Sequence, residues 1–158
     1  MAGNKLAKAW LLCGALDALY ATTLTIVFGK QTVVAMWQGV AAGPFGDAAK
    51  AWGARGALLG LFVHFAIMAV MAAFALALFS RSLLGRLAPW LGGTIYGLAL
   101  WLVMYGIVLP ARFGAPFPNP DPLKLILGMA PHVLLVGIPM AILLRASGQE
   151  KAAVLRSS

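Results

Sequence analysis

The fold is decided by residues 57–79, which read ALLGLFVHFAIMAVMAAFALALF and contain one notable polar side chain, His64. A helix that crosses the apolar core of a bilayer needs about 20 apolar residues. This stretch therefore predicts a membrane-spanning helix. Three other stretches have the same character, so the predicted spans are residues 6–28, 57–79, 90–109 and 123–144.

The composition of the whole chain agrees with this class. Of its 158 residues, 62% are hydrophobic and 10% are charged, and the mean hydropathy is +0.92. Soluble domains average about a quarter charged residues. Lipid offers no partner to unpaired backbone groups, and the alternation typical of barrel strands is absent. The sequence predicts an all-α integral membrane protein, a four-transmembrane-helix bundle that forms a single transmembrane domain over residues 1–158.

The first outer loop is long and apolar. Residues 32–46 read TVVAMWQGVAAGPFG, with apolar side chains at helical spacing. The stretch is too short to span, so it predicts an interfacial or re-entrant helix over about residues 32–42. We expect Gly43, Pro44 and Gly46 to break this helix and Asp47 to cap a new helix that continues into residues 57–79. Asp121 followed by Pro122 predicts the start of the fourth span.

Basic residues set the predicted orientation. The chain has 12 Lys and Arg against 4 Asp and Glu, a formal net charge of +8. In so apolar a chain this excess favours contact with anionic lipid over nucleic-acid binding. Both termini are expected to be cytoplasmic, since this places more basic residues inside. The inner set is Lys5, Lys8, Arg81, Arg86, Arg145, Lys151 and Arg156, and the outer set is Lys30, Lys50, Arg55, Arg112 and Lys124.

The N-terminal stretch has one feature of a cleaved signal peptide, because Lys5 and Lys8 precede an apolar run. Asp17 inside that run argues against removal, so we interpret residues 6–28 as a retained span.

Three polar residues inside the predicted spans need an explanation, since ionisable groups are costly in hydrocarbon. At 1.5 Å per residue, His64 lies about 10 Å, His132 about 13 Å and Asp17 about 16 Å below the outer surface. All three fall in the outer half of the bilayer. Tyr20 is one turn from Asp17, and Tyr105 lies near the outer end of the third span. We therefore predict an intramembrane polar cluster of Asp17, Tyr20, His64, Tyr105 and His132.

The prolines and glycines of the later spans have structural interpretations. Pro131 cannot donate to the carbonyl of Leu127, which then needs another partner. Pro139 leaves the carbonyl of Leu135 free in the same way. The glycines of the third span predict a face for close helix packing; they are Gly92, Gly93 and Gly97.

Three functional hypotheses fit the polar cluster. In the first, its members bond across helices, and the chain is a non-enzymatic accessory or interaction component with a membrane-protein partner or as a homo-oligomer. In the second, a protonatable His and Asp site serves a small transporter or channel. In the third, His64 and His132 ligate haem b or a metal ion, whereas the first two hypotheses need no cofactor.

Motifs for catalysis are lacking. The glycines around residues 39–46 match neither a P-loop nor a dinucleotide fingerprint, and no Ser, His and acid set resembles a hydrolase. The single cysteine, Cys13, excludes a disulfide framework and a cysteine-based zinc site. We therefore expect no catalytic residues and no enzymatic activity.

Several short motifs carry a family resemblance. They are QGVAAG at residues 38–43, LGLFVHF at 59–65, Tyr96-Gly97, VLP at 108–110, and His132 with VGIP at 136–139. In order and spacing they resemble a family of small uncharacterised bacterial four-helix inner-membrane proteins, which is distantly similar to YagU-type proteins. The resemblance covers residues 38–145. It implies a fold, a topology and a bacterial inner-membrane location, but no activity, cofactor or substrate. The family has an asparagine after the methionine of the third span, where this chain has Tyr105 after Met104.

Overall fold

The structure is a computed structural model that describes residues 2–81 and 83–144. This part of the chain consists of helices and connecting turns and has no β-strand. Four helical segments are long and apolar enough to cross a membrane; they are Gly3–Phe28, Gly53–Ser80, Pro89–Phe113 and Pro122–Leu144. The expectation of an all-helical chain with four long apolar helices is therefore confirmed. Arg145, Lys151 and Arg156, which entered the orientation argument, lie outside the described residues.

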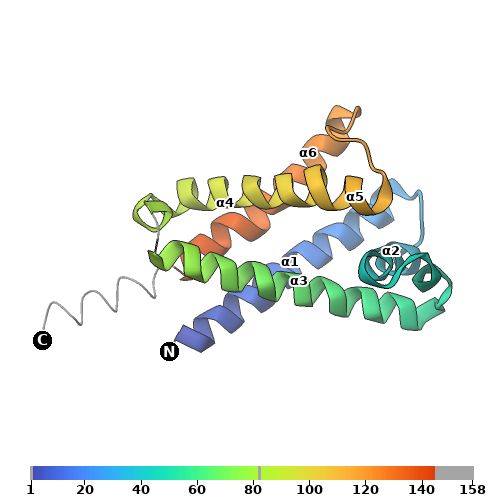
Figure 1. The fold of residues 1–158 in the computed structure, drawn as a ribbon, viewed down its shortest axis with the longest axis horizontal. Coiled ribbons are helices and arrows are strands. Elements are labelled where there is room, and N and C mark those ends of the chain that lie inside the picture. The colour runs from blue at the N-terminus through green and yellow to red at the C-terminus, as the bar shows by residue number, and fades with distance from the viewer. Residues whose placement is uncertain (1, 82, 145–158) are drawn as a thin grey trace, which may run out of the picture.

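The long helices alternate in direction (Figure 1). α1 (Ala2–Phe28) and the third span run one way, and α3 (Gly53–Arg81) and the fourth span return. The third span consists of α4 (Pro89–Val103), a π-helical segment and α5 (Leu109–Phe113), and the fourth begins with α6 (Pro122–Pro131). α2 (Val33–Phe45) lies at the end where α1 finishes and α3 begins. The N-terminus and the turn between α3 and α4 lie at the opposite end.

α2 is the predicted helix of the first loop, and it is longer than expected. Thr32 caps it, since its hydroxyl oxygen accepts a hydrogen bond from the backbone N–H of Ala35 at 3.1 Å. The helix continues through Gly43 and Pro44 and ends at Phe45. Gly43 and Pro44 therefore do not break the helix, which ends just before the third predicted position, Gly46, whose backbone N–H donates to the carbonyl of Ala42.

The start of α3 also differs from expectation. Asp47 does not cap a helix that continues into the second span; it opens a separate 3₁₀ segment, η1 (Asp47–Ala51). α3 begins afresh at Gly53, whose φ of +57° is in the left-handed region that favours glycine. The physical reason is that the Asp47 carboxylate pairs with two cationic side chains, described below, instead of backbone N–H groups. Asp121 does cap α6, by accepting from the N–H groups of Leu123 and Lys124, as predicted.

Both later spans contain a π-helical segment that ends two residues before a proline. The segments are Met104–Val108, before Pro110, and His132–Gly137, before Pro139. At their ends, the N–H of Leu109 bonds to the carbonyl of Met104, five residues back, and Ile138 bonds to Val133 in the same way. A proline clashes with the carbonyl four residues earlier in a regular α-helix. The wider π turn lets each helix continue past its proline.

The third and fourth spans pack with their backbones in close approach. A Cβ atom on Gly93 would lie 2.5 Å from the Cα of Ile138, and one on Gly97 would lie 2.7 Å from the Cα of Val133. The predicted close-packing face on the third span is therefore confirmed, and it packs on the π-helical segment of the fourth. The main apolar core lies beside it and includes Tyr96 and Met140.

Most of the remaining apolar surface points outward. On α3, four large side chains at four-residue or eight-residue spacing are between 62% and 70% exposed; they are Leu58, Phe62, Val70 and Phe74. A soluble monomer rarely exposes contiguous apolar surface on this scale. This surface is of the kind that contacts lipid or another protein.

Candidate functional site

The pair Asp17 and His64 joins α1 to α3. The Nδ1 atom of His64 lies 3.9 Å from Oδ2 of Asp17, and the two side chains are 13% and 21% exposed. The other ring nitrogen, Nε2, lies 3.0 Å from the carbonyl oxygen of Gly14. A carbonyl oxygen only accepts, so Nε2 carries the hydrogen of this bond. The tautomer of His64 is thereby fixed, with Nδ1 facing the carboxyl group.

The separation of 3.9 Å between His64 Nδ1 and Asp17 Oδ2 is that of an ion pair and exceeds hydrogen-bond length. The two ionisable side chains therefore face each other between α1 and α3 without a direct hydrogen bond.

Aromatic side chains enclose His64. The ring of Trp37, on α2, meets it edge to face at a centroid distance of 5.5 Å, and Phe65 does so at 5.4 Å. The Phe65 ring is within 2.8 Å of where a Cβ atom of Gly14 would lie, so only glycine permits this packing. α2 therefore covers one side of the pair, and the loop helix is part of the site.

Tyr105 and His132 lie in the two π-helical segments and contact each other. Their ring centroids are 5.7 Å apart at an interplanar angle of 85°. His132 Nδ1 donates to the carbonyl of Gly128, one turn earlier, at 2.9 Å. The absence of a side chain on Gly128 makes room for the Tyr105 ring. π-helical segments recur at functional sites in proteins, and here both coincide with predicted site residues.

Tyr20 binds the backbone group that Pro131 leaves free. Its hydroxyl donates to the carbonyl of Leu127 at 2.9 Å, which ties α1 to α6. Leu127 is four residues before Pro131, so this carbonyl has no backbone donor at its regular α-helical position. The prediction that this carbonyl needs another partner is confirmed, and the partner is a side chain. Tyr20 was placed in the predicted cluster but was not identified as this partner.

The five residues of the polar cluster come from all four long helices. Asp17 faces His64, Tyr105 contacts His132, and Tyr20 binds the carbonyl of Leu127. Among the described residues, no ring contact joins the two imidazoles directly. Nε2 of His64 faces the carbonyl of Gly14, so Nδ1, which faces Asp17, is the ring nitrogen that could serve as a ligand. The hypothesis of paired histidine ligands stays a prediction.

A buried donor beside the cluster has no partner within the part of the chain that the structure describes. This is Nε1 of Trp101. The Trp101 ring stacks on Tyr105 at 6.3 Å and meets Phe117 at 5.4 Å. A buried indole N–H usually finds an acceptor. Trp101 was absent from the predicted site, since a tryptophan in an apolar span carries no distinguishing sequence signal.

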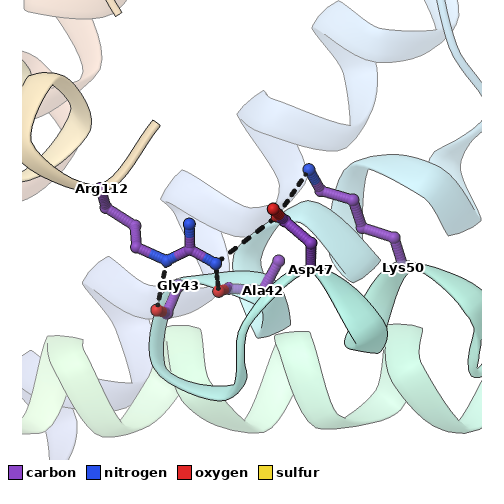
Figure 2. A network of polar contacts seen from close by, with 5 residues as sticks. All are labelled: Ala42, Gly43, Asp47, Lys50 and Arg112. Carbon is purple, nitrogen blue, oxygen red and sulfur yellow. Dashed lines mark hydrogen bonds and ion pairs between the residues drawn. The ribbon is translucent and has the colours of Figure 1, made fainter. Parts of the chain in front are cut away.

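A second polar network, also missed by the sequence argument, holds the end of α2 (Figure 2). Arg112, on α5, donates through Nε to the carbonyl of Gly43 at 3.0 Å and through Nη2 to that of Ala42 at 2.7 Å. Nη2 also lies 3.5 Å from Oδ1 of Asp47, which pairs with Lys50 at 2.9 Å. The hydrogen bond and charge of Lys50, with the charge of Arg112, hold the pKa of Asp47 below its usual value.

Comparisons of the chain with family models, with curated proteins and with solved structures give no match. The family resemblance described above therefore stays a prediction.

Proposed function

We propose that the chain is a multi-pass integral protein of the bacterial inner (cytoplasmic) membrane, with both termini cytoplasmic. Alternation of the four apolar helices supports this, because the N-terminus and the turn between α3 and α4 lie at the same end. Lys5, Lys8 and Arg86 lie at that end, as the positive-inside rule favours.

Labelling of single cysteines tests this topology, in a background where the buried Cys13 is replaced by alanine. Asn119→Cys should react with an impermeant maleimide in intact spheroplasts. Ser147→Cys, outside the described residues, should react only after permeabilisation. The reverse pattern would overturn the orientation.

We further propose that α2 lies in the outer interface of the membrane. Its 13 residues are too few to span, and exposed Lys30 and Gln31 precede it. The charged network of Arg112, Asp47 and Lys50 at its other end suits headgroup depth. Spin labels along α2 should therefore all report one shallow depth, whereas a re-entrant segment would show a steady increase in depth.

The function that the geometry supports best is that of a non-enzymatic accessory or interaction component. The observation that supports this function is that the hydrogen-bond donors of the cluster bind backbone carbonyls of the chain itself. Tyr20, His64 and His132 each donate to a backbone carbonyl within the bundle. Trp10 and Tyr96 do the same, to the carbonyls of Phe65 and Met71. All of these bonds except that of His132, which stays within its own helix, join two helices and so fix the bundle. The wide apolar face of the bundle remains for lipid or for another membrane protein.

Purification in a mild detergent tests this proposal. An accessory protein is expected to co-purify with one membrane protein at fixed stoichiometry, or as a defined homo-oligomer. Substitution of Phe62 and Val70 on the exposed face of α3 by serine should reduce that association, and serine at the buried Ala72 should leave it unchanged if the fold is retained. An isolated monomer at every detergent concentration would contradict the proposal.

A second function is favoured by one specific observation, the approach of two ionisable side chains, Asp17 and His64, to 3.9 Å. Such a site inside a membrane suits a small transporter or channel that couples to protons. In this alternative the pair takes up and releases a proton as the solute moves. The partial exposure of both side chains supports access to the pair.

Reconstitution of the purified chain alone separates the two functions. In liposomes with an internal pH dye, a transporter acidifies the interior when a proton gradient is imposed, and an accessory protein does not. His64→Gln is the matched variant, because an amide N–H still donates to the carbonyl of Gly14 but holds no extra proton. Flux that persists unchanged in this variant would remove Asp17 and His64 from any transport route.

A further inference from the structure

An apolar groove of about 610 Å³ lies between α2, α3 and the third span. Its volume is within the range of sites that hold a small organic ligand. Its walls come from three elements and are formed by Met36 and Val40, by Ile67, and by Met104, Val108 and Leu109. These walls belong to the apolar part of the chain, so the groove opens where lipid chains are present if α3 and the third span cross the membrane.

One end of the groove is cationic. Lys50 and Arg112 both contribute to its lining, and a single carboxylate, that of Asp47, lies between them. Two positive charges and one negative charge leave this end with a surplus of +1. The cations also lie near the ring of Phe113, at 5.9 Å and 4.9 Å. The groove therefore has the polarity of an amphiphile, with an apolar length and a basic end.

Hydrogen-bond donors remain at the cationic end. Arg112 uses Nε and Nη2 for its bonds, and Nη1 points away from the network (Figure 2). Lys50 makes one ion pair and has three N–H donors. A guanidinium edge and a nearby ammonium are suited to phosphate.

Missing side chains create the space. Gly39 and Gly43 line the groove on α2, and a Cβ atom on either would meet no heavy atom within 4 Å. Glycine inside a helix costs stability relative to larger residues. The two positions thus keep open a groove that side chains of ordinary size would fill.

We propose that this groove binds one anionic phospholipid, with an acyl chain along the apolar walls and the phosphate against Arg112 Nη1 and Lys50 Nζ. Charge complementarity at the basic end distinguishes this occupant from a zwitterionic lipid or a partner helix. The bonds of Arg112 to Ala42 and Gly43 remain in place, so lipid binding adds to the link between α2 and α5. The proposal goes beyond the accessory function and does not depend on it.

Native mass spectrometry of the full chain, with equimolar phosphatidylglycerol and phosphatidylcholine, tests the proposal. The wild-type chain should retain phosphatidylglycerol preferentially. Lys50→Gln should lower that preference about fivefold, the contribution of one basic residue near an anionic lipid. Gly39→Leu should abolish it, because a Cβ atom at residue 39 meets no heavy atom within 4 Å and the rest of the leucine side chain would occupy the groove. Lys8→Gln is the matched control, since it removes the same charge from an exposed position at the other end and should change nothing.

Gly39→Leu is the deciding variant, because its unfolding temperature shows independently whether the fold is kept. A preference that survives in this variant would mean surface attraction without a groove site and would overturn the proposal. Equal retention of both lipids by the wild-type chain would do the same. Inorganic phosphate that displaces phosphatidylglycerol and binds Gly39→Leu as well as wild type would identify a free-anion site instead, which also refutes the proposal.

Discussion

Replacement of Tyr20 by phenylalanine removes one hydroxyl and leaves the carbonyl of Leu127 without its donor. The effect should depend on Pro131, because this proline is the reason that the carbonyl is free. Pro131→Ala restores a backbone N–H four residues after Leu127. We therefore expect Tyr20→Phe to be costly in the native background and nearly neutral in the Pro131→Ala background.

The size of the effect follows from the bond. Hydrogen bonds between helices in membranes contribute about 0.6 kcal/mol on average and at most about 1.7 kcal/mol. The cost of Tyr20→Phe should exceed the average, since the carbonyl is left without any donor and an unsatisfied buried group costs about 1–3 kcal/mol. Tyr20→Phe should therefore lower the free energy of unfolding by about 1 kcal/mol, a factor of about 5 in the unfolding equilibrium. The coupling energy with Pro131→Ala should be nearly as large.

Unfolding in mixed micelles of dodecyl maltoside and dodecyl sulfate measures the four free energies of this cycle. Tyr96→Phe is the control, because its hydroxyl donates to the Met71 carbonyl at 2.7 Å and no proline frees that group. Its cost should be the same with and without Pro131→Ala. An equal cost of Tyr20→Phe in both backgrounds would refute the assignment of the hydroxyl to the carbonyl that the proline frees.

Three further predictions concern packing, pH and ligands. Gly93→Ala should destabilise the fold by about 1–3 kcal/mol through overpacking. Gly39→Ala should stabilise it by up to about 1 kcal/mol, because a Cβ atom there meets open space. If the two variants change the thermal unfolding temperature equally, the close approach of the third and fourth spans at Gly93 is contradicted. The pKa of Asp47 is lowered in the folded state, so its pairing with Lys50 stabilises the folded state at pH values above the ordinary aspartate pKa of about 3.9. This stabilisation is lost as the pH falls through the lower pKa of the folded state. The stability difference between wild type and Asp47→Asn should hence be constant from pH 7 to about pH 5 and vanish at strongly acid pH, and a difference that grows on acidification would contradict it. The purified chain should show the same absorption spectrum with and without His64→Gln, since the accessory function needs no cofactor; a Soret band that this variant removes would establish haem ligation.

The sequence predicted the parts of the fold that depend on hydrophobicity and on single backbone rules. Four apolar stretches became four helices, and the Asp121 cap formed as expected. The need of the Leu127 carbonyl for a partner followed from Pro131 alone. Close packing at Gly93 and Gly97 followed from the absence of side chains. Each of these features was inferred from the residues of one continuous stretch of the chain.

Features that depend on distant partners were not predictable. Arg112 was counted only as an outer charge, because its acceptors, Ala42 and Gly43, are about 70 residues away. The same network withdrew Asp47 from its expected capping role. The π-helical segments were missed too. A proline inside an apolar stretch predicts a kink or a break in the helix, and it does not indicate that the turn before it contains one extra residue. The members of the polar cluster were proposed from their depth in the bilayer, but depth did not indicate that Asp17 faces His64 and that Tyr105 contacts His132.

The π-helical segment of the third span determines the direction in which the side chains of α5 point around the helix axis. A π turn contains one residue more than an α turn, and one residue corresponds to about 100° of rotation around a helix axis. Before the segment, Gly97 faces the fourth span, and beyond it Arg112 faces α2. Deletion of a single residue between Met104 and Val108 would restore a regular helix but turn Arg112 by about 100° away from the carbonyls of α2. One surplus residue thus decides whether two halves of the same helix serve different neighbours.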